Sequence, residues 1–363
     1  MNKTYHLFFQ LPRYWVFREF GKPKILPVNY TFLISTECNS RCLTCNIWKQ
    51  KHKELTLEEW EKIFTSLGKS PFWVTISGGE PFLKSYLADL VINLDNMCQP
   101  AIINIPTNSL LPGIIEKQLI NILLRVKKTP IVVNLSLDGV GKIHDQIRGI
   151  PGNFEKVVEN YQNVKKLQTK YPNLMVGFNS VISKYNINTC PELFKFVYKL
   201  HPDSYITEIA EQRVELGTIN MDITPNYKQY THAINNLVSV FKRYKFKKIG
   251  LIAGAFRQEY YHFVKDWLSG KKVLNDYAGY SSCEISSWGE VWPSCIKAEN
   301  MGNLRSNRFN FKKIWFSQKA DKIRKRIKKT GTSYPLANAF YTNALFNAGT
   351  IVKTIGRIII ASI

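Results

Sequence analysis

Acidic residues are scarce in this 363-residue chain, which has 27 Asp and Glu against 50 Lys and Arg and a formal net charge of +23. Such a surplus of positive charge indicates an anionic partner, such as nucleic acid, a membrane surface or a phosphorylated substrate. A compositional bias toward Lys, Ile and Asn would explain the lysines, but it would not explain the shortage of acids. With 45% hydrophobic residues the chain is neither disordered nor fibrous. Its length fits one large domain with appendages or two modest domains.

Cysteine is also sparse, and no long hydrophobic run opens the chain. The seven cysteines are an odd number and three of them fall between positions 38 and 45, which excludes a small secreted disulfide scaffold. Near the N-terminus, Gln10, Pro12 and Arg13 interrupt the apolar residues, which excludes a continuous signal-peptide core. We therefore expect a cytoplasmic protein with reduced thiols.

From residue 29 onward, short apolar runs alternate with helical patterns, which is typical of βα units with a parallel sheet. The expected fold class is α/β, a partial (β/α)6 parallel barrel with a small C-terminal α+β extension. Strands are expected at 29–35, 73–77, 102–107, 131–137, 174–181 and 204–210, and helices at 112–125, 153–167, 192–201 and 227–244. A further helix begins at a capping box, Thr56 with Glu59, and closes near Gly68.

Four regions follow from this pattern. Residues 1–27 form an aromatic and basic segment, 28–245 the barrel, 246–343 the extension and 344–363 an amphipathic helix. Polar residues follow the first four expected strands, where the loops of a parallel barrel converge on one rim. We therefore expect the working groups of the protein to lie together at this rim.

Three cysteines, Cys38, Cys42 and Cys45, follow the first strand within a single loop. Soft thiolates suit zinc or an iron–sulfur cluster. A four-iron cubane held by three cysteines keeps one iron open for a small molecule, whereas a structural zinc site is closed by a fourth protein ligand. His52 is a candidate for that ligand, so the loop alone leaves both alternatives open.

The Cys-x-x-x-Cys-x-x-Cys motif after a first strand resembles the hallmark of the radical S-adenosylmethionine (SAM) superfamily. The segment 77–81, Ser-Gly-Gly-Glu-Pro, resembles the Gly-Gly-Glu loop of that superfamily, whose backbone and carboxylate receive the amino group of the methionyl moiety. Glycines permit a close backbone approach, and the Glu80 carboxylate can accept charge-assisted hydrogen bonds. Thr44 stands where the superfamily often has an aromatic residue, but that position is not a ligand.

The segment from Ser136 to Gly149 resembles the fourth-strand region of the branch that modifies peptides, sugars and other metabolites. The resemblance assigns Ser136 and Asn179 to the ribose, methionyl or adenine portions of SAM, and Arg148 to its carboxylate. Alternatively, His144, Asp145 and Arg148 form a salt-bridged helix start. The full set expected to bind the cofactor is Gly78, Gly79, Glu80, Thr107, Asn108, Ser136, Asp138, Arg148 and Asn179.

The resemblance implies that the protein binds a 4Fe–4S cluster and SAM and cleaves SAM reductively to a 5′-deoxyadenosyl radical. That radical would take hydrogen from an unidentified metabolite, glycan, lipid or peptide, with electrons supplied by a small donor protein such as flavodoxin or ferredoxin. The sequence singles out no catalytic side chain for the substrate. Two alternatives remain. One is an RNA-modifying member of the superfamily, suggested by the positive charge although no nucleic-acid-binding module is recognisable. The other is a non-catalytic zinc-binding scaffold.

Cys283 and Cys295 frame a segment that resembles the start of a SPASM or shorter twitch extension, which holds auxiliary iron–sulfur clusters in relatives. No cysteine follows Cys295, and two cysteines cannot fully ligate a cluster that normally takes four. Either the auxiliary cluster is lost, or Cys98, Cys190 or another group completes it. We expect two buried thiols in a degenerate domain.

The tail from Ala344 places most of its apolar residues on one helical face, with Lys353 and Arg357 opposite. It is too short and too charged to span a bilayer, but a basic amphipathic helix can lie in the interface of an anionic membrane. The aromatic N-terminal segment would sit beside it. The alternative is that both ends pack on the barrel.

Overall fold

Nine strands form one sheet in the computed structural model, which describes residues 3–242, 249–271, 273–330 and 334–362. Their order is β6-β5-β4-β3-β2-β1-β7-β8-β9. Strands β1 to β6 run parallel, β7 joins β1 in parallel on its other side, and β8 and β9 are antiparallel. The strands are β1 Asn29–Leu33, β2 Trp73–Ser77, β3 Ile102–Thr107, β4 Ile131–Ser136, β5 Leu174–Ile182, β6 Ser204–Ile209, β7 Ser282–Ile285, β8 Glu290–Trp292 and β9 Gly302–Asn303.

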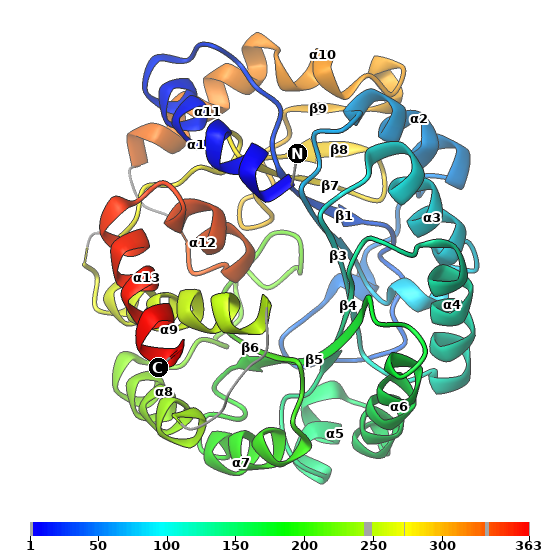
Figure 1. Ribbon diagram of the computed structural model, residues 1–363, viewed down its shortest axis with the longest axis vertical. Coiled ribbons are helices and arrows are strands. Elements are labelled where there is room, and N and C mark those ends of the chain that lie inside the picture. The colour runs from blue at the N-terminus through cyan, green and yellow to red at the C-terminus, as the bar shows by residue number, and fades with distance from the viewer. Residues whose placement is uncertain (1–2, 243–248, 272, 331–333, 363) are drawn as a thin grey trace.

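Helices surround this sheet, as Figure 1 shows. Helices α2 to α8 alternate with the strands and cover the outside of the barrel, while α1 and α9 to α13 belong to the two ends of the chain. The α-helices are α1 Lys3–Phe20, α2 Leu57–Leu67, α3 Leu87–Cys98, α4 Pro112–Arg125, α5 Lys142–Arg148, α6 Asn153–Gln168, α7 Cys190–Leu200, α8 Tyr227–Phe241, α9 Ile249–Leu268, α10 Phe311–Trp315, α11 Gln318–Thr330, α12 Ala337–Ala344 and α13 Ala348–Ser362. Short 3-10 helices lie at Ile47–Lys49, Pro81–Leu83 and Arg305–Asn307.

The predicted partial barrel is confirmed, and each of the six predicted strands is found within two residues of its expected ends. These strands form where they do because apolar runs such as Ile131–Ser136 are buried on both faces of a parallel sheet. The capping box of α2 is also present: the Glu59 amide donates to Thr56 Oγ1 at 3.3 Å, and the Thr56 amide donates to Glu59 Oε2 at 3.0 Å. The helix ends at Gly68, whose φ is +58°.

The barrel is open between its edge strands β6 and β9, since no pairing joins β6 to the β7–β9 side of the sheet in the described chain. Helices α9 and α12 fill the opening (Figure 1). Tyr260 of α9 links the two sides, because its hydroxyl donates to Pro335 O at 2.7 Å and accepts from the Ile209 amide at 3.4 Å. The interior of the barrel therefore stays accessible to side chains from the C-terminal region.

The C-terminal helix predicted over 344–363 is found as α13, but it begins at Ala348, because Ala344 is the last residue of α12. Arg357 was expected on the solvent side, yet its Nε lies 2.7 Å from Glu259 Oε1 of α9. The side chains beyond residue 357, which include Ile358 and Ile359 of the predicted apolar face, lie outside the described part. None of the described helices combines the length and the apolarity that a bilayer crossing requires.

Candidate functional site

A cavity of about 650 Å³ occupies the barrel interior and is lined by every residue predicted to bind the cluster or the cofactor. It extends from the cysteine loop past inward-facing Thr31 and Thr75 to Val28 and Phe72 at the opposite end of the strands. The working groups therefore meet at one rim, as parallel topology requires.

The cysteine loop is held by backbone hydrogen bonds to the end of α5. The Arg41 amide donates to Arg148 O and the Leu43 amide to Ile147 O, both at 2.9 Å. Two thiols also receive side-chain contacts: Asn108 Nδ2 lies 3.8 Å from Cys38 Sγ, and an Arg148 guanidinium nitrogen lies 3.6 Å from Cys42 Sγ. The loop geometry is therefore set by the barrel before any ligand binds.

The spacing of the three thiols separates the two metal alternatives. In a tetrahedral zinc site with Zn–S bonds of about 2.3 Å, two sulfurs lie only about 3.8 Å apart. The three sulfurs of Cys38, Cys42 and Cys45 do not all fall within 4.8 Å of one another. His52, the candidate fourth zinc ligand, stacks on Trp288 with 3.7 Å between ring centroids. The loop thus suits a larger, multi-iron cluster better than a zinc ion.

Burial disfavours free thiolates in this loop. Desolvation raises the pKa of Cys38, and together with the neighbouring Cys42 it raises the pKa of Cys45 to about 12. Because cluster irons bind thiolates, a bound cluster would supply positive charge beside Cys38 and Cys45.

The two glycines after β2 pack against the cysteine loop. A Cβ on Gly78 would lie 2.3 Å from Ser35 O, and one on Gly79 would lie 2.0 Å from Glu37 O. The Gly79 amide donates to Ser35 O at 2.8 Å, and Gly78 has a φ of +135°. Glycine is required at both positions because the backbone of the cysteine loop passes so close.

Glu80 is 1% exposed and its carboxylate accepts three hydrogen bonds. The donors are the Asn108 amide at 2.7 Å, the Thr107 hydroxyl at 2.8 Å and the Phe82 amide at 3.2 Å. Burial raises the pKa of Glu80 to about 7, although these hydrogen bonds oppose the shift. Thr107 and Asn108 therefore orient the Glu80 carboxylate toward the cavity that all three residues line.

Asp138 and Arg148 form a buried ion pair at 2.9 Å, with side chains 2% and 12% exposed. The other oxygen of Asp138 accepts from the Val181 amide at 2.8 Å. Arg148 is the last residue of α5, so the predicted salt-bridged helix start is wrong for this residue. Asp145 does cap a helix start, because it accepts from the amides of Gly152 and Phe154 at 2.7 and 2.8 Å.

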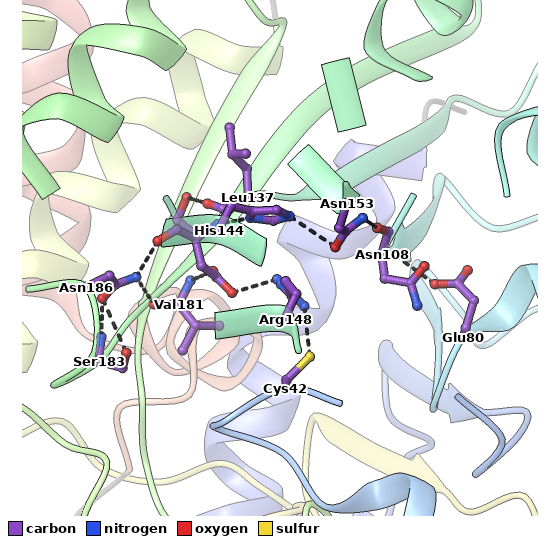
Figure 2. Close-up of polar contacts among 12 residues, drawn as sticks. Cys42, Glu80, Asn108, Leu137, His144, Arg148, Asn153, Val181, Ser183 and Asn186 are labelled. Atoms are coloured by element: carbon purple, nitrogen blue, oxygen red, sulfur yellow. Dashed lines mark hydrogen bonds and ion pairs between the residues drawn. The ribbon is translucent and has the colours of Figure 1, made fainter. Parts of the chain in front are cut away.

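A chain of hydrogen bonds connects the ends of β3 and β4, as Figure 2 shows. Asn153 Nδ2 donates to Asn108 O at 2.9 Å, and Asn153 Oδ1 lies 3.1 Å from His144 Nε2. His144 Nδ1 accepts from the Asp138 amide at 3.1 Å. Burial lowers the pKa of His144 to about 3, so the imidazole is neutral at pH 7. Its role is to hold the ends of β3 and β4 together rather than to transfer protons.

Ser136 and Asn179 are paired neighbours at the ends of β4 and β5, and both line the cavity. Asn179 Oδ1, Arg148 Nε and Ser40 Oγ are buried there without a hydrogen-bond partner in the described chain. Buried polar atoms are normally paired, so these three point to a polar ligand. The residues present therefore fit a cluster-bound cofactor with amino, carboxylate and hydroxyl groups.

Cys283 and Cys295 face different surroundings. Cys283 belongs to the main apolar core outside the sheet, whereas Cys295 packs with a separate apolar group and lines the cavity. Cys98 and Cys190, the other candidates for completing an auxiliary cluster, are also buried in the main core. These placements accord with the expectation of buried thiols and bring Cys295 alone of the four to the cavity.

An acidic wall of the cavity was missed by the sequence analysis. It begins with Glu208 on β6, continues after that strand with Glu211 and Glu215, and ends with Glu284 on β7. Arg213 pairs with Glu211 at 2.9 Å and with Glu208 at 3.4 Å. The sequence could have predicted this wall. Charged residues directly after the sixth predicted strand are expected at the same rim as the polar residues that follow the first four strands.

Comparison with known proteins relates part of the chain to one superfamily. Residues 32–197 match the model of the Radical SAM superfamily. Fe-coproporphyrin III synthase of Methanosarcina barkeri is 27% identical over 44% of this chain and 38% of its own length. The sporulation killing factor maturation protein SkfB of Bacillus subtilis is 29% identical over 39% of this chain and 33% of its own length. The matched region thus spans well under half of each of these relatives.

Solved structures share the fold over a larger part of the chain. Streptococcus suis SuiB bound to S-adenosylmethionine superposes with a TM-score of 0.58 at 17% sequence identity, covering 82% of this chain and 68% of SuiB. At this sequence identity the similarity supports a shared fold and nothing more. It agrees with the partial barrel.

Proposed function

The chain belongs to the radical SAM superfamily, and we propose that it is an enzyme that cleaves SAM reductively and abstracts hydrogen from a substrate in the same cavity. One observation carries the proposal. A single cavity brings together three thiols spaced too widely for zinc and a Gly-Gly-Glu loop packed against Ser35 and Glu37, which lead into the cysteine loop.

Each group has a defined part in this proposal. Cys38, Cys42 and Cys45 would hold three irons of a 4Fe–4S cluster, and the fourth iron would bind SAM. When bound, the cluster supplies the electron that cleaves the sulfonium. Glu80 would accept the amino group of SAM, and its orientation is fixed by the Thr107 and Asn108 donors.

The remaining lining residues fit the rest of SAM. Arg148 has an unpartnered Nε in the cavity wall and is positioned to receive a carboxylate, while its pairing with Asp138 keeps it in place. Asn179 and Ser136, which line the same cavity, would contact the ribose or adenine. The barrel wall would exclude water from the reacting groups, as radical chemistry requires.

The test is anaerobic reconstitution followed by reduction with dithionite in the presence of SAM, with 5′-deoxyadenosine as the product measured. We expect about four irons per chain, the content of one cubane cluster, and their loss on replacing Cys38, Cys42 and Cys45 together by Ala. Glu80→Ala should keep the iron but weaken SAM binding. Iron and visible absorption retained by the triple variant would contradict the proposal.

The same proposal includes a small electron-donor protein such as flavodoxin or ferredoxin, because the cluster must be reduced before each cleavage. The positive net charge supports an acidic donor of this kind. An RNA substrate is a weaker alternative, since the polar groups of the cavity wall beyond the SAM residues include four carboxylates, which would repel phosphates.

We also propose that the enzyme attaches peripherally to anionic membranes through α1 and α13. On α13 the side toward the protein carries Thr354, which is 2% exposed, and Arg357, while Val352 and Ile355 are 69% and 51% exposed. On α1, Phe9 is 74% exposed. Large apolar side chains presented outward beside an exposed lysine, here Lys353, are typical of interfacial helices.

The two helices lie close enough to act as one surface. Tyr14 of α1 contacts Phe346, which directly precedes α13, with 5.7 Å between ring centroids. On the same helix α1, Trp15 and Phe20 are 49% and 73% exposed. Aromatic side chains are favoured at the level of lipid headgroups, which supports this orientation.

Co-sedimentation with vesicles containing anionic lipid tests the attachment. Replacing Val352 and Ile355 by Ser should reduce pelleting, because each buried apolar side chain contributes about 1.5–3 kcal/mol. Leu124→Ser is the matched control, since Leu124 is 56% exposed on α4 at the far side of the barrel. Added salt should weaken binding without abolishing it. Equal pelleting of both variants and wild type would contradict the proposal.

A further inference from the structure

Three side chains in the acidic wall converge on one point. Glu215, Glu284 and Cys295 each place a ligand atom within 4.8 Å of the other two, and this is the one such group among the described His, Cys, Asp and Glu residues. They are 8%, 7% and 2% exposed, and all three line the cavity. None of the three cysteines of the loop belongs to this group, although Glu215 lies close enough to Cys45 to interact with it electrostatically.

The backbone holds these side chains together. Glu284 lies on β7, opposite Thr31 of β1, and Cys283 beside it points to the other face of the sheet as strand geometry requires. The Glu215 amide donates to Cys295 O at 3.3 Å. Two loops and one strand of the sheet therefore fix the three groups, with no dependence on a bound ligand.

The charge at this point is only partly balanced by the protein. Arg213 forms its ion pairs with Glu208 and Glu211 and acts on Glu215 and Glu284 electrostatically, but no ion pair within the described chain reaches these two carboxyl groups. Glu284 Oε2 is buried and has no hydrogen-bond partner there. An unpaired carboxylate oxygen at such a position loses its hydration without compensation, which is unfavourable unless it binds a proton or a metal cation.

We propose that Glu215, Glu284 and Cys295 bind a divalent transition-metal ion, zinc, in the cavity wall. One thiolate and two carboxylates are ligands that such ions accept, and three protein ligands leave a coordination position open. That position faces the cavity, where it can hold an oxygen or nitrogen atom of the substrate. The ion is distinct from an iron–sulfur cluster because only one cysteine takes part.

Zinc is the probe that tests this site, because the cluster contains none. Anaerobically reconstituted protein with its cluster intact is dialysed against Zn²⁺, and zinc and iron per chain are both measured. We expect one zinc per chain with the iron unchanged. Zinc K-edge absorption should show one sulfur at about 2.3 Å and oxygens at about 2.0–2.2 Å.

Variants assign the ligands. Cys295→Ala and Glu284→Gln should each weaken zinc binding roughly tenfold or more, by analogy with the effect of altered metal surroundings. Cys283→Ala is the matched control, since this thiol lies next to Glu284 on the strand but faces the core. Circular dichroism establishes that each variant is folded. The absorption spectrum of wild type tests the proposal even where a variant does not fold.

Several results would overturn the proposal. One is that wild type binds no zinc. Another is that the bound zinc is surrounded by three sulfurs, as the cysteine loop would provide. A third is equal zinc binding by Cys295→Ala and Cys283→Ala. Binding of an organic ammonium compound without any zinc would assign the acidic wall to a cationic substrate instead. The cleavage of SAM is measured separately, so failure of the metal site leaves the proposed function intact.

Discussion

Replacing Arg148 by Met removes the guanidinium that neutralises Asp138 while keeping a side chain of similar length. The pair is almost completely buried, with 2.9 Å between the charged groups. The variant leaves the Asp138 carboxylate with one remaining hydrogen bond, from the Val181 amide. We therefore expect a large loss of stability from a single substitution.

The magnitude follows from the burial. Removing one partner of a buried ion pair destabilises a protein by about 3–5 kcal/mol, because the other charge stays uncompensated. With an unfolding entropy of about 2.1 cal/mol/K per residue, this corresponds to a fall in Tm of roughly 4–7 °C for a chain of this length. The double variant Arg148→Met with Asp138→Asn should recover much of the loss, because it leaves no stranded charge.

Thermal unfolding of the protein without its cluster, followed by circular dichroism, measures these effects. Arg41→Met is the matched control, since Arg41 lies in the cysteine loop and is exposed, and it makes hydrogen bonds only to nearby carbonyls. Arg41→Met should lower the free energy of unfolding by about 1 kcal/mol or less. Equal losses from Arg148→Met and Arg41→Met, or strict additivity in the double variant, would refute the reasoning.

Three further outcomes are expected. Gly79→Ala should lower the free energy of unfolding by about 1–3 kcal/mol, measured by chemical denaturation, because its Cβ meets a carbonyl oxygen at 2.0 Å. Gly113→Ala, which has open space around the new Cβ, should lower it by nothing. Burial raises the pKa of Glu80, so the folded protein favours its neutral form. Its contribution to the free energy of unfolding is therefore full below about pH 4.5 and is lost as pH rises through about 7. Glu80→Gln should therefore gain in Tm relative to wild type between pH 5 and pH 8, and a constant difference would contradict this assignment. Cys283→Ala with Cys295→Ala should change the iron content little, and a loss of about four irons would instead establish an auxiliary cluster.

The strands and the rim loops could be predicted because their causes are local. An apolar run such as Ile131–Ser136 is dictated by burial on both faces, and Thr56 with Glu59 marks a helix start within four residues. The spacing of the cysteines likewise defines a loop that can hold a cluster. These features depend on neighbours in the sequence, so the sequence displays them directly.

Other features depend on residues far apart in the chain. Nothing near Glu284 indicates that it faces Glu215 and Cys295, because the contact arises from the pairing of β7 with β1. The unwinding of the tail between Ala344 and Ala348 and the turn of Arg357 toward Glu259 reflect packing on α9. The two ends of the chain were therefore the least predictable part.

The position of β7 beside β1 also bears on how the protein is made. Strand β1 is synthesised early, but its second partner, Ser282–Ile285, is about 250 residues later in the chain. Until that segment leaves the ribosome, β1 is an edge strand with unpaired amides and carbonyls, which other chains can join. A fragment ending after β6 would keep this edge permanently, so we expect it to aggregate although it contains the whole cysteine loop. Expression of the cluster-binding region therefore calls for the complete chain.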